Sequence, residues 1–249
     1  MTNKRSTRTL IITLIFLAVL SAALCTVFAP FWSDSHPRYP SSTGGFHDHG
    51  DYKINLATII GSLDHGDTNV FITEPEIPNT PSSSRILWHY SDFLKVVNAL
   101  YQHVWHEPLS DWKAYEVLLS TSCENNLKGF ETSRFTFIKT VWIGGSLFYA
   151  GRSMTILPNY DTVSWGGGTN FAHPIFGWKT YDLNRFKISA DDALRIAEEN
   201  GGEKNRVTYN NRCDIVLSLG DTGWMVAYDH FTIDIDPYTG TFKVLSTVK

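Results

Sequence analysis

The chain has 249 residues, a formal net charge of −4 and 14% aromatic residues, including eight tryptophans. This composition excludes a globally disordered chain and is sufficient for the core of one or two small domains. Lys4, Arg5 and Arg8 lie at the N-terminus, and the rest of the chain holds 18 basic residues against 25 acidic ones. Because contacts to phosphate need clustered Lys and Arg, we expect no nucleic-acid partner.

An apolar run from Leu10 to Ala29 contains no charged residue. A helix of about 20 apolar residues spans the hydrocarbon layer of a membrane. Three basic residues precede the run and the next one is Arg38, which places the N-terminus in the cytoplasm. We therefore expect residues 1–29 to form a cytoplasmic N-terminus and a single-pass anchor in the cell membrane, with the remainder extracytoplasmic.

The alternative is a cleaved signal peptide, which would leave a secreted protein. Signal peptides have an apolar core of about 7–15 residues followed by a small-residue site, and this run is longer. One candidate site, Ser21–Ala23, lies inside the run, and the other, Val27–Ala29, is followed by Pro30. A lipid-modified Cys25 would need a small residue before it, where Leu24 stands. Both interpretations place the domain on the same side of the membrane.

Residues 30–51 are rich in Ser, Pro, Gly and His, and this composition predicts a flexible stalk. Its last part contains the metal candidates His47, His49 and Asp51. Imidazole and carboxylate groups at short spacing can ligate zinc or copper. A flexible segment is not a preorganised site, however, so a solvated linker is the competing interpretation, and we expect no cofactor.

Residues 52–180 are predicted to form an α+β middle lobe. Apolar residues from Phe93 to Val104 recur at three- and four-residue steps, which favours a helix. A second helix is predicted over about Ser110–Ser120, with Ser110 as its N-cap. From Arg134 onward, β-favouring segments alternate with glycines and predict strands.

Residues 181–249 give the clearest pattern, a helix followed by an antiparallel meander. Ser189 is a good N-cap, Asp191 and Asp192 suit the positive first turn, and Gly201-Gly202 is expected to end the helix. The helix carries an apolar stripe, and Trp224 and Phe231 are expected to fill the space beside it. The stripe consists of Ala190, Ala193, Leu194 and Ala197.

The segment from Phe186 to Leu245 resembles a PepSY domain. The resemblance rests on Ile188–Gly202, on the strand Trp224–Tyr228, and above all on the ending Ile233–Leu245, with an Asp, a turn closing in Thr-Gly and a last strand. It covers about a quarter of the chain. The family is extracytoplasmic, often membrane-anchored, and is thought to bind or restrain peptidases without being catalytic itself.

One segment of the middle lobe is weakly similar in sequence to the end of the PepSY-like segment. The segment Met154–Trp165 parallels Phe231–Phe242, because each begins with an apolar-Thr-Ile sequence and has a tyrosine turn before a closing strand. This pattern indicates either a degenerate PepSY-like repeat or an unrelated α+β lobe.

Two cysteines, Cys123 and Cys213, lie in the exported part, where the compartment permits disulfides. They either form a bridge or remain two separately buried thiols. A bridge would close a loop of about 90 residues and contribute up to about 4 kcal/mol in the chain-entropy model.

The sequence thus predicts an α+β protein with an N-terminal transmembrane helix, followed by helix-plus-antiparallel-sheet lobes, the last one PepSY-like. We expect a non-enzymatic binding protein whose partner is a peptidase or another envelope protein. Two alternatives remain: a metal-dependent or hydrolytic envelope enzyme with an unrecognised site, and a structural subunit of an envelope complex.

Overall fold

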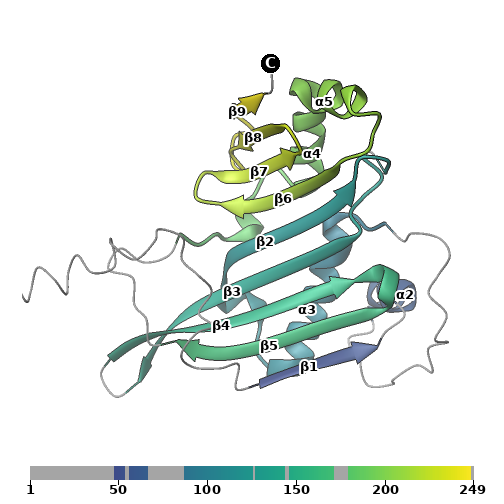
Figure 1. The fold of residues 1–249 in the computed structure, drawn as a ribbon. Helices are drawn as coiled ribbons and strands as arrows, with labels where there is room; N and C mark the ends of the chain where they lie inside the picture. The colour runs from purple at the N-terminus through teal and green to yellow at the C-terminus, as the bar shows by residue number, and fades with distance from the viewer. Residues whose placement is uncertain are drawn as a thin grey trace, which may run out of the picture.

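The computed structural model describes residues 48–53, 56–66, 87–125, 127–143, 146–170 and 179–247. Its main feature is one nine-stranded antiparallel sheet in the order β1-β5-β4-β3-β2-β6-β7-β8-β9 (Figure 1). The strands are β1 (Asp48–Lys53), β2 (Lys113–Ser122), β3 (Thr132–Ile143), β4 (Ser146–Leu157), β5 (Thr162–Asn170), β6 (Asp214–Gly220), β7 (Gly223–Tyr228), β8 (Phe231–Ile235) and β9 (Phe242–Thr247).

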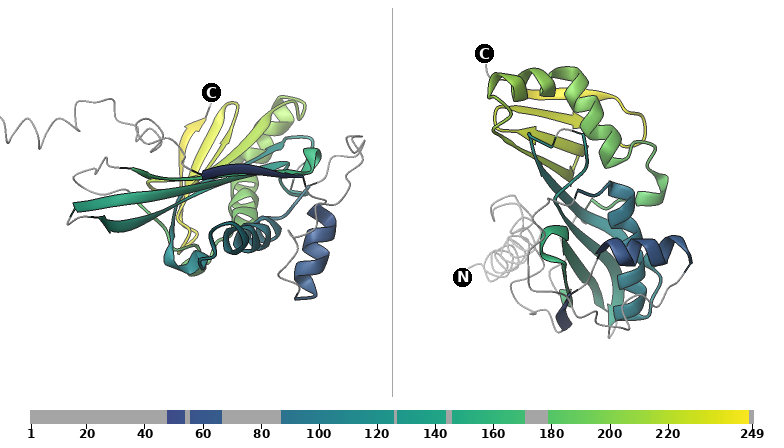
Figure 2. Two further views of the ribbon diagram at one scale, coloured as in Figure 1. Left: turned by 90° about the horizontal axis from the view of Figure 1, so that it is seen from below. Right: turned by 90° about the vertical axis from the view of Figure 1, so that its right-hand side faces the viewer.

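The helices lie on the same side of this sheet, as the right-hand view of Figure 2 shows. The predicted α+β class, with a large antiparallel sheet and few helices, is therefore confirmed. The helical elements are α2 (Leu56–Asp64), α3 (Tyr90–Trp105), α4 (Ala190–Ala197), the π-helical turn η4 (Glu198–Gly202) and α5 (Glu203–Thr208), with short 3-10 turns η1 (Leu109–Asp111), η2 (Pro158–Tyr160) and η3 (Leu183–Arg185).

A helix followed by four antiparallel strands occurs twice in the chain. The first unit is α3 with β2 to β5, and the second is α4 with β6 to β9. The segments Met154–Trp165 and Phe231–Phe242 occupy corresponding places, because each runs from the third strand of its unit through a turn into the fourth. The first strands of the units, β2 and β6, pair antiparallel, so both units share one sheet.

The C-terminal unit is held together by the helix stripe and the alternating strands, as predicted. All four stripe residues of α4 are buried, and so are Trp224 and Phe231. Every second residue of β6, namely Ile215, Leu217 and Leu219, faces the same core. Burial of such side chains contributes about 1.5–3 kcal/mol each for the larger ones.

The predicted end of this helix at Gly201-Gly202 is confirmed, because the backbone angles of Asn200 and Gly201 are non-helical there. Gly201 has φ +128°, and a second helix, α5, follows directly after this break. A Cβ atom on Gly202 would lie 2.6 Å from the Tyr228 hydroxyl. The glycine pair therefore permits a kinked helix to approach the sheet closely.

The helix predicted over Ser110–Ser120 is wrong. Only η1 is helical there, and Lys113–Ser122 forms the strand β2. Side chains of β2 alternate about the sheet, with Val117, Leu119 and Thr121 buried. β2 is a central strand between β3 and β6, and pairing on both edges outweighs the weak helical spacing of its sequence.

Asp191, in the first turn of α4, also forms hydrogen bonds with the start of α3 in the first unit. Its carboxylate accepts hydrogen bonds from the Tyr90 backbone N–H, at 3.0 Å, and from the His89 ring nitrogen Nδ1, also at 3.0 Å. The capping box of α4 instead uses Asp192 with Ser189. The start of α3 is thus tied to the start of α4, and the two units are joined through helices as well as through strands.

The structure tests only part of the predicted division of residues 1–51 into an anchor and a stalk. β1 begins at Asp48, so the predicted stalk over residues 30–51 extends too far by its last four residues, because these pair with β5. The predicted anchor, residues 10–29, lies outside the described residues. Within the described ranges, no helix combines the length and apolar character that crossing a membrane requires.

Candidate functional site

The predicted metal ligands do not form a site in the described part of the chain. His49 and Asp51 are exposed on β1 and, two residues apart on a strand, lie on the same face. His47 lies outside the described residues. In the residues that the structure describes, no group of three or more His, Cys, Asp or Glu side chains is arranged to hold a metal ion.

Cys123 and Cys213 form a disulfide at the junction of the two units. Cys123 follows β2 and Cys213 precedes β6, so pairing of these strands brings the Cα atoms to 5.2 Å. The Cys123 N–H also donates to the Cys213 carbonyl oxygen at 2.8 Å. The bridge therefore links the first strand of one unit covalently to the first strand of the other.

A surface depression of about 300 Å³ lies beside this disulfide. Its lining mixes acidic, basic and amide side chains and contains no histidine or free thiol. It is formed by Ser122, Glu124, Asn211, Arg212, Cys213, Asp214 and Asp229.

Arg152, on β4, is the centre of an aromatic cluster beneath the end of α3. Its guanidinium carbon lies 4.4–5.2 Å from the ring centroids of Tyr101, Trp105 and Trp112. It donates to the Tyr101 hydroxyl at 2.9 Å and to the Glu107 carboxylate at 3.3 Å. These cation–π and hydrogen-bonded contacts already satisfy the charge, so the cluster holds α3 on the sheet.

Glu107 is the exposed end of this cluster. Partial burial opposes its ionisation, but hydrogen bonds from Trp112 and Arg152 and the charge of Lys139 outweigh that effect and keep its pKa below the usual range. The Lys139 ammonium lies 3.8 Å from Glu107 and 3.7 Å from Asp111. A carboxylate held ionised in this way suits an ion-pair network better than a general acid.

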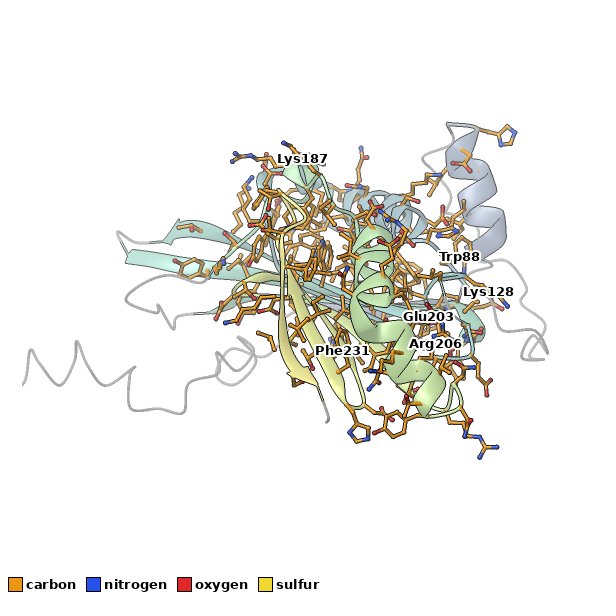
Figure 3. All side chains as sticks on the ribbon, turned by 90° about the horizontal axis from the view of Figure 1, so that it is seen from above. Trp88, Lys128, Lys187, Glu203, Arg206 and Phe231 are labelled. Atoms are coloured by element: carbon orange, nitrogen blue, oxygen red, sulfur yellow. A yellow bond between two sulfur atoms is a disulfide. The ribbon has the colours of Figure 1, made fainter. Side chains whose placement is uncertain are left out.

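A second charged network is buried in the C-terminal unit, where Arg206 of α5 is labelled in Figure 3. Its guanidinium donates to Glu198 at 3.0 and 3.2 Å, and the Tyr228 hydroxyl donates to the same carboxylate at 2.8 Å. Asn211 accepts the remaining Nη1 hydrogen bond at 2.6 Å. The members of this network form hydrogen bonds with one another, and these bonds hold α5 against β7. The network therefore has a structural role.

The exposed apolar side chains identify a different candidate, at the end of the sheet. Four of the seven large hydrophobic side chains that are exposed in the described residues lie between positions 238 and 245: Tyr238, Phe242, Val244 and Leu245. We call these four residues, together with Lys243, the edge surface. β9 ends the strand order, and in the described part of the chain no strand pairs with its free edge. Exposed apolar side chains gathered along an unpaired edge strand are typical of protein interaction sites.

The opposite edge of the sheet has a different character. β1 has the sequence DHGDYK, in which three of the six residues are charged, and Trp165 leaves no room for a side chain at Gly50. Charges and short length protect edge strands against pairing with other chains. The contrast indicates that the apolar edge at β9 is a specific feature of the C-terminal unit.

The sequence predicted the strand at the C-terminus but not the edge surface. The missed signal is Phe242-Lys243-Val244-Leu245, whose apolar residues occupy both faces of the last strand that the structure describes. Comparisons of the chain with protein-family models, curated proteins and solved structures found no match.

Proposed function

We propose that this protein is a membrane-tethered, extracytoplasmic binding protein that captures another envelope protein through the edge surface. The C-terminal unit acts as a PepSY-like module, and a peptidase that it restrains is one candidate partner. The protein itself performs no catalysis in this proposal.

The edge surface is the observation that carries the proposal. Phe242, Val244 and Leu245 are 48%, 38% and 47% exposed, and they are neighbours on one strand. Leaving such a patch in water is unfavourable, since each buried methylene is worth about 0.8 kcal/mol. Binding of a partner that covers these side chains is favoured by this burial free energy. Single exposed apolar residues elsewhere on a surface are common and do not indicate a binding site.

The PepSY-like sequence features include the same strand. The most specific part of the resemblance, Ile233–Leu245, spans β8, the turn and most of β9. The unit also has the order of one helical segment and four antiparallel strands that the resemblance implies. These features support a binding role for the unit and, with it, for β9.

The proposed location rests on two independent features. The apolar run Leu10–Ala29 with its preceding basic residues favours an anchor with the C-terminus outside, or a secreted protein if the run is cleaved as a signal peptide. The disulfide between Cys123 and Cys213 suits an oxidising compartment.

Affinity capture from detergent-solubilised membranes tests the proposal. The full chain is expected to retain an envelope protein in near-stoichiometric amount. The double variant Phe242→Glu/Val244→Glu should lose it, because two carboxylates would be desolvated in the interface. The control is Tyr160→Glu, which changes a side chain 69% exposed in η2 and should retain the partner. Equal recovery by all three proteins, or recovery by none, would contradict the proposed function.

A further inference from the structure

We infer that the free edge of β9 accepts an extended acidic segment of the partner as a tenth strand of the sheet. This inference rests on the proposed function and specifies how the edge surface binds. Strand addition to an exposed sheet edge is a general mode of peptide recognition, in which main-chain hydrogen bonds provide affinity and alternate side chains provide specificity.

The backbone of β9 is arranged to accept such a strand. The Asp236 N–H donates to the Thr241 carbonyl at 2.8 Å, where the turn between β8 and β9 closes. Hydrogen-bonded and non-hydrogen-bonded pairs alternate along an antiparallel ladder. In the observed register, this alternation directs the peptide groups of Phe242 and Val244 away from β8, toward the free edge.

The side chains of β9 define what an added strand must carry. Phe242 and Val244 lie opposite Ile235 and Ile233 of β8, so one face of this edge is apolar. Lys243 projects from the other face, where its neighbour on β8 is Asp234. An added strand would therefore place apolar residues beside Phe242 and Val244 and a carboxylate beside Lys243, giving an acidic–basic–acidic row across three strands.

Charge selects this occupant over a second copy of the chain. β9 has the sequence FKVLST, so its one charged residue is Lys243. A carboxylate on an added strand would lie beside this lysine. A second copy paired through β9 would offer only another Lys243 and no carboxylate, so it would not complement this charge.

The probes for this inference are two synthetic peptides, one alternating valine with glutamate and the other alternating valine with lysine. Binding of each to the full chain in detergent is measured by fluorescence anisotropy. The glutamate peptide is expected to bind, and the lysine peptide to bind about five-fold more weakly or not at all, as one cross-strand charge pair allows. The variant Lys243→Glu should reverse this order.

The variant Val244→Pro tests whether the backbone carries the binding. Proline is tolerated on the outer side of edge strands but removes the N–H that the added strand would use. It should abolish binding of the glutamate peptide with little change in melting temperature. The matched variant Val244→Thr keeps the N–H and should still bind.

Binding of the glutamate peptide by Val244→Pro, equal binding of both peptides, or binding of neither would overturn the inference. So would a concentration-dependent dimer of the full chain that Val244→Pro abolishes, because a second copy would then occupy the edge. Capture of the envelope protein by Val244→Pro but not by Phe242→Glu/Val244→Glu would leave the proposed function intact and reject strand addition.

Discussion

Replacing Trp224 by alanine is expected to destabilise the protein by about 3–5 kcal/mol, the usual cost of removing a large buried aromatic side chain. Trp224 is fully buried and its indole N–H donates to the Ile188 carbonyl at 3.0 Å. Its ring lies 5.6 Å from that of Tyr90 and 5.8 Å from that of Phe186, so it contacts both units. Denaturant unfolding followed by circular dichroism measures the loss.

Because Tyr90 belongs to α3, we expect both units to be destabilised together and not the C-terminal unit alone. The control Trp224→Phe keeps most of the ring and loses the hydrogen bond, so it should cost less than the alanine variant. A variant Trp224→Ala with unchanged stability would mean that the core assignment of this side chain is wrong.

Replacing Arg206 by methionine is expected to cost about 3–5 kcal/mol, because it leaves the Glu198 carboxylate buried without its cation. Both side chains are buried, with exposed fractions of 8% and 6%. The loss should be visible as a lower denaturant midpoint.

The double variant Arg206→Met/Glu198→Gln separates charge from packing. Glutamine keeps an acceptor for the Tyr228 hydroxyl, which donates to Glu198 at 2.8 Å in the structure, and leaves no buried charge. We therefore expect it to recover more than half of the stability lost by Arg206→Met. A double variant no more stable than the single one would show that the unpaired charge is not the cause.

The sequence was most informative where local pattern and tertiary structure agree. In the C-terminal unit, alternation over Ile215, Leu217 and Leu219, the helix stripe, and the turn ending in Gly240, with φ +75°, were all readable from neighbouring residues. These features depend on positions a few residues apart, so a single sequence contains them.

The features that the sequence did not reveal depend on distant partners. β2 lies between two strands, and its partners on β6 are 92 to 100 residues later in the chain. The carboxylate of Asp191 reaches the start of α3, 101 residues earlier in the chain. The start of a second helix directly after Gly201 depends on the close fit of Gly202 against Tyr228.

The edge surface was missed for a related reason. The sequence shows that the last strand is apolar, but only the strand order shows that β9 lies at an open end of the sheet. The metal candidates stay a prediction, because His47 lies outside the described residues. Within these residues, no third His, Cys, Asp or Glu joins His49 and Asp51.

Site-specific photo-cross-linking in intact cells tests the central claim most directly. A photoreactive amino acid in place of Phe242 reports whether another protein covers the edge surface, and the same amino acid in place of Tyr160 serves as the control. We expect one discrete adduct with an envelope protein from position 242 and none from position 160. The absence of an adduct at position 242, or the same adduct at both positions, would contradict the account.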